Sequence, residues 1–179
     1  MTYKTHVAFA LMTAAPIPFI FDFSIQEIVA FYSMVVIGSL APDLDEQGSY
    51  LSRKLPIFPI IFGLFGITHR GVTHQLISVI VLCFGAVLFN VIAGEKYELY
   101  KFFVSGFIIG YIMHLAGDML TKGGINNFFY PFSKTKAVLL PRKLRFFTGS
   151  IQEYIVFSFV SLVVLFEAYL YMPSIVGVF

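Results

Sequence analysis

The four histidines of this chain, and several of its few acidic residues, stand in short polar islands within an apolar sequence. The chain has 179 residues, of which 58% are hydrophobic and only 12% are charged. Ionised groups are costly in apolar surroundings unless they are paired or bound to a metal. Imidazole and carboxylate ligands without thiolates suit Zn²⁺, with Mn²⁺ or Fe²⁺ as alternatives. We therefore predict a site for one or two divalent ions, with Zn²⁺ favoured, and its candidate ligands are His6, Asp43, Asp45, His69, His74, His114, Asp118 and Glu153.

The strongest pair of candidate ligands is His114 and Asp118. They are four residues apart, so on a helix both side chains project from one face, about one turn from each other. The same row continues backwards through Gly110 and Gly106, and small residues allow a neighbouring helix to approach closely. The alternative role of this pair is a His–Asp hydrogen bond that holds two helices together.

The segment Thr68-His-Arg-Gly-Val-Thr-His74 places two imidazoles and a guanidinium within six residues. Arg70 is suited to bidentate contact with a phosphate and to stabilising charge on a phosphoryl oxygen. Gly71 permits a tight turn before the next helix. We predict catalytic roles for Arg70, His74 and Asp45.

The remaining candidates have plain structural alternatives. Asp43 and Asp45, in Pro-Asp-Leu-Asp, are also typical of a solvated turn that ends a helix. His6 lies near the chain start, where an interfacial histidine is unexceptional. Glu153 follows Ser150 by three residues, which is the spacing of a helix capping box.

The elements that position these residues are predicted to be membrane helices. A mean hydropathy of +0.85 with 18% aromatic residues is typical of an integral membrane protein. Apolar stretches of about 20 residues are long enough to cross a bilayer. We predict a single domain over residues 1–179, an all-α bundle of about five transmembrane helices near 6–21, 26–42, 74–93, 100–121 and 151–171. The connection 43–73 contains an apolar stretch too short to span, which predicts a re-entrant or interfacial segment.

Two further features limit the class of protein. The single Cys83 excludes an intramolecular disulfide and a cysteine-based zinc site. The first apolar stretch could also serve as a signal peptide, but it continues past Pro16 and Pro18, and we expect it to be a retained helix.

Basic residues gather in the connections 43–73 and 122–150, and Lys4 precedes the first helix. Cytoplasmic loops carry an excess of lysine and arginine, which predicts a cytoplasmic N-terminus and cytoplasmic placement of both connections. Five alternating spans give the same topology. All candidate ligands then lie at the cytoplasmic face of the inner membrane.

The motifs Gly38-Ser-Leu-Ala-Pro-Asp-Leu-Asp45, His69-Arg-Gly-Val-Thr-His74 and His114-Leu-Ala-Gly-Asp118 resemble those of bacterial and archaeal inner-membrane metal-dependent hydrolases, some of them LexA-regulated. The resemblance runs from His6 to about Glu153. A more distant likeness is to the zinc-dependent phospholipase C and single-strand nuclease fold, whose ligand order is similar to His6, Asp45, His69 or His74, and His114 with Asp118. Two histidines of that pattern have no counterpart here, so the resemblance implies one or two metal ions rather than three.

These observations predict a membrane-embedded, metal-dependent hydrolase that cleaves a phosphoester of a phospholipid or lipid-linked phosphate. Bound metal ions generate hydroxide at neutral pH and stabilise the oxygens of phosphoryl transfer. The basic, aromatic connection 122–150 suits anionic head groups, and we expect no specific nucleic-acid partner. The alternatives are a transporter that uses intramembrane His and Asp for an ion path and a scaffold with a structural metal.

Overall fold

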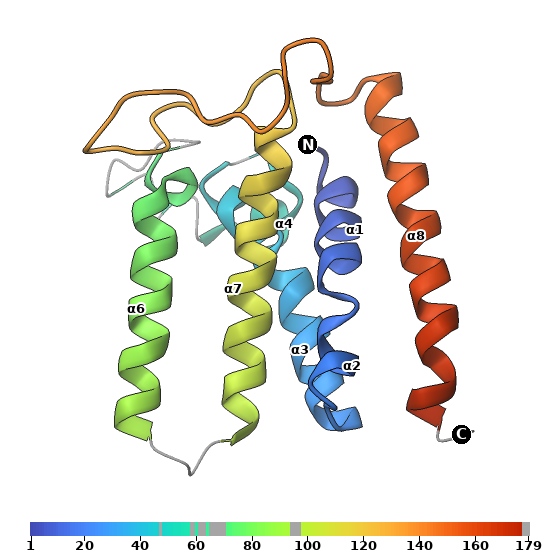
Figure 1. Ribbon diagram of the computed structural model, residues 1–179. Coiled ribbons are helices and arrows are strands. Elements are labelled where there is room, and N and C mark those ends of the chain that lie inside the picture. Colours follow the sequence, from blue (N-terminus) through green and yellow to red (C-terminus); the bar gives the residue numbers. More distant parts are fainter. Residues whose placement is uncertain (47, 58–59, 61–63, 65–70, 94–97, 177–179) are drawn as a thin grey trace.

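The computed structural model describes residues 1–46, 48–57, 60, 64, 71–93 and 98–176, and within these it is built from helices, without a β-strand. Figure 1 shows the elements standing side by side, with the N-terminus and the start of the last helix at the same end. In chain order they are α1 (Tyr3–Ala14), α2 (Ile17–Ile20), α3 (Ile25–Gly38), the 3₁₀ helix η1 (Ala41–Asp45), α4 (Tyr50–Lys54), the 3₁₀ helix η2 (Val72–His74), α6 (Leu76–Ala93), α7 (Glu98–Met119) and α8 (Ile151–Val176). The all-α prediction is confirmed for the described residues.

The centre of the fold is the pair of helices α3 and α7, whose backbones pack in direct contact. A Cβ atom added to Gly106 or Gly110 of α7 would collide with a carbonyl oxygen of α3, and one on Gly38 would collide with the carbonyl oxygen of Phe107. Only glycine allows this approach, because its missing side chain brings two backbones together. Phe31 and Val35 of α3 are fully buried in the adjoining apolar core.

The prediction of about five spanning helices is wrong, because fewer helices have the length and the apolar composition that a membrane span requires. Among the described residues, two helices are both long and apolar enough to cross a membrane, Glu98–Met119 and Ile151–Met172. Pro16 and Pro18 divide the first apolar stretch into α1 and the single turn α2, because proline removes a backbone donor and clashes with the preceding turn. Helix α3 has 14 residues, about 21 Å of helix, which is shorter than a hydrocarbon core of roughly 30 Å. Helix α6 is a further apolar but shorter segment.

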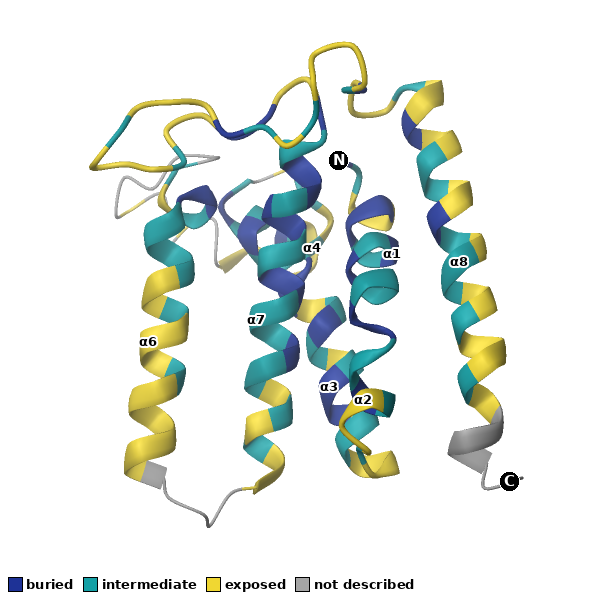
Figure 2. Cartoon of the chain, viewed as in Figure 1, coloured by how far each residue is buried: buried dark blue, intermediate teal, exposed yellow. Residues whose placement is uncertain are grey.

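Apolar side chains are exposed along the two outer helices, as the yellow stretches of α6 and α8 in Figure 2 show. Exposed residues of α8 include Ile155, Phe159 and Leu162, and those of α6 include Phe84 and Val91. Apolar surface of this extent marks contact with a membrane or a partner rather than with water. The buried residues concentrate instead in α1, α3 and α7.

The polar islands meet at one end of this bundle. The start of α1, the end of α7 and the 3₁₀ helices η1 and η2 lie there, and the connection to α8 passes over the same end (Figure 1). Two isolated bridges, Thr121 with Phe146 and Ile125 with Ala137, fold that connection back on itself. Most of the predicted re-entrant or interfacial stretch up to Ile67 lies outside the described residues.

Candidate metal centre

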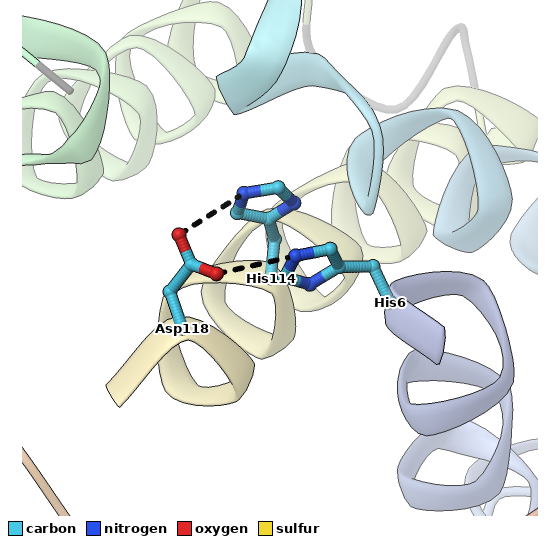
Figure 3. A group of neighbouring side chains, drawn as sticks. All are labelled: His6, His114 and Asp118. Atoms are coloured by element: carbon cyan, nitrogen blue, oxygen red, sulfur yellow. Dashed lines mark ion pairs between the residues drawn. The ribbon is translucent and has the colours of Figure 1, made fainter. Parts of the chain in front are cut away.

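Helices α1 and α7 bring His6, His114 and Asp118 into contact (Figure 3). The imidazole rings of His6 and His114 stack with their centroids 3.7 Å apart. Oδ1 of Asp118 lies 3.3 Å from Nε2 of His6, and Oδ2 lies 4.0 Å from Nε2 of His114. One ligand atom from each residue lies within 4.8 Å of the others, which is the spacing that a single metal ion requires. Gly117 leaves room for this arrangement, because a Cβ there would lie 3.2 Å from Nδ1 of His6 and would collide with the side chain of Met1.

A second group joins the first through His114. Oδ1 of Asp43, in η1, lies 3.5 Å from Nε2 of His74 and 3.5 Å from Nε2 of His114. These three ligand atoms also lie within 4.8 Å of one another. Nε2 of His74 is 3.8 Å from Oδ2 of Asp118, so the two groups form one continuous cluster. We call His6, Asp43, His74, His114 and Asp118 the five-residue cluster.

Backbone and hydroxyl groups fix the orientation of two of these imidazoles. Nδ1 of His114 donates to the carbonyl oxygen of Ser39 over 2.7 Å. The hydroxyl of Thr73 donates to Oδ2 of Asp45 over 2.6 Å and lies 3.0 Å from Nδ1 of His74, from which it can then accept. Both arrangements place the ring proton on Nδ1 and leave the Nε2 lone pair directed into the cluster. Outer hydrogen bonds of this kind select the tautomer of metal-binding histidines.

The donors fit a divalent metal ion. His6, His74 and His114 are at most 1% exposed, and Asp118 is 2% exposed. Within the described residues, Nε2 of His114 and both ring nitrogens of His6 are buried without a hydrogen-bond partner. Buried polar atoms are normally satisfied, and each exception calls for an explanation such as an ion. A divalent cation among these nitrogens and carboxylates would satisfy Nε2 of His114 and one ring nitrogen of His6.

Asp43 connects the cluster to the surface. Its side chain is 24% exposed. Burial alone would raise the pKa of Asp43, but the adjoining His114 and His74 outweigh burial and hold that pKa well below its ordinary value. Asp43 therefore remains an anionic group at neutral pH. Together with Asp118 it lines a polar pocket of about 440 Å³, which gives a small molecule access to the cluster.

The structure brings five of the eight predicted ligands together and places two others beside them. Asp45 lies behind His74, 4.0 Å from its Nδ1 and on the side away from the cluster. The two carboxylate oxygens of Glu153 accept from the backbone N–H groups of Thr2 and Gly149, each over 2.6 Å. Glu153 thus holds the start of α1 to the start of α8. His69 and Arg70 lie outside the described residues.

Sequence reasoning missed two groups that orient the histidines. The Ser39 carbonyl is a backbone group, and no residue type announces it. Thr73 carried a usable signal, since a threonine directly before a candidate metal-binding histidine can hydrogen-bond to its ring. The N-terminal amino group of Met1, which lies 2.6 Å from Oδ1 of Asp118, also had no sequence signal.

A helical bundle with exposed apolar helices and, at one end, a buried His/Asp cluster that could hold a metal ion is consistent with a membrane protein. The match to a family model is specific: residues 1–177 match the model of the YdjM inner membrane protein. The chain therefore belongs to the YdjM inner membrane protein family.

Individual relatives agree with this assignment. The chain is 28% identical over 159 residues to the uncharacterized protein YvsG of Bacillus subtilis (strain 168), covering 88% of both chains. It is 33% identical over 91 residues to the inner membrane protein YdjM of Escherichia coli (strain K12), covering 50% of this chain and 44% of that protein. No solved structure matches the chain. The likeness to the zinc-dependent phospholipase C and nuclease fold therefore gains no support.

Proposed function

We propose that this protein is a membrane-embedded, metal-dependent phosphoesterase that acts on a phospholipid or lipid-linked phosphate at the cytoplasmic face of the inner membrane. The single observation that carries the proposal is the five-residue cluster. Its buried nitrogens and carboxylates converge beneath a polar pocket at the end of a bundle with an apolar exterior.

The cluster offers ligands for one Zn²⁺ ion that is bound through His114. Nδ1 of His114 is occupied by the Ser39 carbonyl, so only Nε2 can bind a metal. Both groups of candidate ligands need that nitrogen, and one lone pair serves one ion. A second ion would have to bind without His114.

The residues of the cluster and those behind it would have different roles in binding the metal ion. A divalent ion bound here would supply Lewis acidity and a water molecule of lowered pKa. His6, His74, His114 and Asp118 would hold it in a dry environment, and Asp43 would hold it from the pocket side. Thr73 and Asp45 would keep His74 in the ligating tautomer. Asp45 is thus proposed as a positioning residue.

The proposed reaction is hydrolysis at phosphorus. The oxygen of a water molecule forms a bond to phosphorus while the ester P–O bond breaks, and the proton lost by the water leaves with the alcohol. Phosphate oxygens gain charge during this step and are stabilised by cationic groups. We retain Arg70 as a proposed phosphate contact from its sequence context alone.

A lipid substrate is supported by the surroundings of the cluster. The connection 122–150 passes over the same end of the bundle and contains six lysine and arginine residues together with Phe128, Phe129, Tyr130 and Phe132. Basic and aromatic residues gather where cytoplasmic loops meet anionic head groups. A multi-pass topology with a cytoplasmic N-terminus would place the cluster at that surface.

The test is metal analysis of protein purified in lipid nanodiscs, followed by phosphate-ester hydrolysis assays on phospholipids and lipid phosphates. We expect about one zinc ion per chain and zinc-dependent hydrolysis. His114→Ala should lose both. Glu98→Gln is the matched control, because Glu98 is exposed at the opposite end of α7 and pairs with Lys101. Bound zinc without hydrolysis of any such ester would favour the ion-handling alternative, and a zinc-free wild type would end the proposal.

A further inference from the structure

We propose that the substrate of the metal centre is an amphiphile with an extended hydrocarbon chain. Its anionic head group occupies the polar pocket beside Arg53, and its chain lies in an apolar groove between α1 and α8. This inference rests on the proposed function and specifies how its substrate is held.

The polar pocket joins a cationic side chain to the five-residue cluster. Arg53, at the end of α4, lines the same pocket as Asp43 and Asp118. Its Nε donates to the carbonyl oxygen of Gly48 over 3.1 Å, which fixes the direction of an otherwise exposed guanidinium. A guanidinium carries five N–H donors and suits bidentate contact with a phosphate. A phosphoryl group held by Arg53 would therefore lie next to the metal ligands.

Tyr3 connects this pocket to the groove. Its side chain lines the polar pocket and also the nearer of two apolar hollows that lie between α1 and α8 and form the groove. The ring of Tyr3 stacks on that of Tyr50, with the centroids 4.4 Å apart. An amphipathic ring at this position suits the junction between a polar head group and an apolar chain.

The groove consists of two hollows that follow one another along both helices. Their volumes are about 440 and 330 Å³, and Leu11 and Val164 line both. The upper hollow, which is nearer the polar end of the bundle, is lined by Ala8 and Ser161. The lower hollow is lined by Ala15 and Ala168. Ser161 and Ala168 are seven positions apart on α8, and Ala8 of α1 and its C-cap residue Ala15 have the same spacing. Residues at this spacing lie on one helix face about two turns from each other.

The groove has defined ends. Tyr3 borders its polar end, and the stacked rings of Phe19 and Tyr171 border the other, with centroids 3.9 Å apart. Along α8, from Phe157 to Tyr171, this corresponds to about 21 Å. Both helices start at the polar end of the bundle (Figure 1). A lipid lying there would run from the head-group level into the membrane with its chain parallel to the helices.

A hydrocarbon chain suits this groove better than a side chain from another protein would. The walls are mainly apolar, and the groove shares Tyr3 with the pocket that contains the candidate metal ligands Asp43 and Asp118. An amphiphile fills both with one molecule, whereas a second copy of this chain would fill only the apolar part.

The test uses zinc-loaded protein in nanodiscs and a hexadecylphosphonate, which has no ester bond to hydrolyse and carries a diazirine at the middle of its chain. After irradiation, peptide mass spectrometry locates the crosslinks. We expect them on α1 and α8 around Leu11 and Val164. Ser161→Phe should fill the upper hollow and lower the yield about tenfold, which corresponds to excluding about two CH₂ groups at roughly 0.8 kcal/mol each. Leu162→Phe, on the exposed side of α8, should leave the yield unchanged.

The proposed contact between Arg53 and the anionic head group is tested with the same probe. Arg53→Gln should weaken binding of the hexadecylphosphonate while zinc content stays at the wild-type value, and Lys54→Gln is its neighbouring control. Crosslinks spread equally over α6 and α8, equal yields for Ser161→Phe and Leu162→Phe, or crosslinks between two protein chains would each overturn the inference. Specific crosslinks without hydrolysis would support the groove and count against the phosphoesterase. Hydrolysis of lipid phosphates without these crosslinks would do the reverse.

Discussion

Small residues line two helix pairs in this protein, and they produce opposite results. Between α3 and α7, Gly38, Gly106 and Gly110 bring two backbones into contact. Between α1 and α8, Ala8, Ala15, Ser161 and Ala168 leave hollows. The difference lies in what faces each small residue. The glycines face carbonyl oxygens of the neighbouring helix, whereas the alanines and the serine line hollows together with larger side chains such as Leu11 and Val164.

This difference matches the work we assign to each pair. The close pair positions His114 against the Ser39 carbonyl, which directly follows α3, and a metal ligand needs that fixed geometry. The open pair is tied at its polar end by Glu153, which accepts from the backbone of Thr2. Farther from the polar end than this contact, the hollows between α1 and α8 leave space that a hydrocarbon chain can occupy.

The largest effect is expected from replacing a glycine at the contact between α3 and α7 with a larger residue. Gly110→Leu should prevent correct packing, because its side chain would meet the backbone of Val35 and Ser39. Backbone atoms cannot move aside cheaply, and we expect a destabilisation of about 3 kcal/mol or more. The measurement is the yield of monodisperse protein, together with its zinc content.

The matched control is Gly85→Leu on α6, since a Cβ atom at Gly85 meets nothing within 4 Å. Equal yields for the two variants would show that α3 and α7 do not pack through their backbones.

A smaller effect is expected behind His74. Thr73→Val removes the hydroxyl between Nδ1 of His74 and Asp45. Loss of such an orienting group should weaken zinc binding by about 10- to 100-fold, measured by competition with a zinc chelator. Thr13→Val is the control, because the Thr13 hydroxyl donates only to carbonyls of its own helix. Unchanged affinity in Thr73→Val would remove Thr73 and Asp45 from the account.

The smallest effect is expected at the tie between α1 and α8. Glu153→Gln replaces an anionic acceptor of two backbone N–H groups and should cost about 1 kcal/mol of stability, as the loss of a helix cap does. Zinc content should not change, whereas a ligand role for Glu153 would make it fall. Thermal unfolding and metal analysis of the same sample separate the two outcomes.

The sequence was informative where residue type carries chemistry. The spacing of His114 and Asp118 predicted one helix face, and the glycine row before them predicted a close helix neighbour. Polarity identified the candidate ligands that gather at one end. Type and polarity did not separate the ligands from Asp45 and Glu153, because a carboxylate that orients a neighbour has the same sequence signature as one that binds a metal.

Helix length was the weaker prediction. Apolar runs suggested five spans, but a run records hydrophobicity and not continuity of the helix. Prolines divide the first run, and α3 ends at Gly38, where the backbone approaches Phe107. The groove between α1 and α8 could not be predicted, because it depends on side chains that meet only after the helices have packed.

The most direct test of the central claim is zinc K-edge X-ray absorption spectroscopy on the protein purified in nanodiscs. We predict one tightly bound zinc ion with imidazole nitrogens at about 2.0–2.1 Å and carboxylate oxygens at about 2.0–2.2 Å. The nitrogen contribution should fall in both His6→Ala and His74→Ala. A spectrum with oxygen ligands alone, or one that neither substitution changes, would contradict the account.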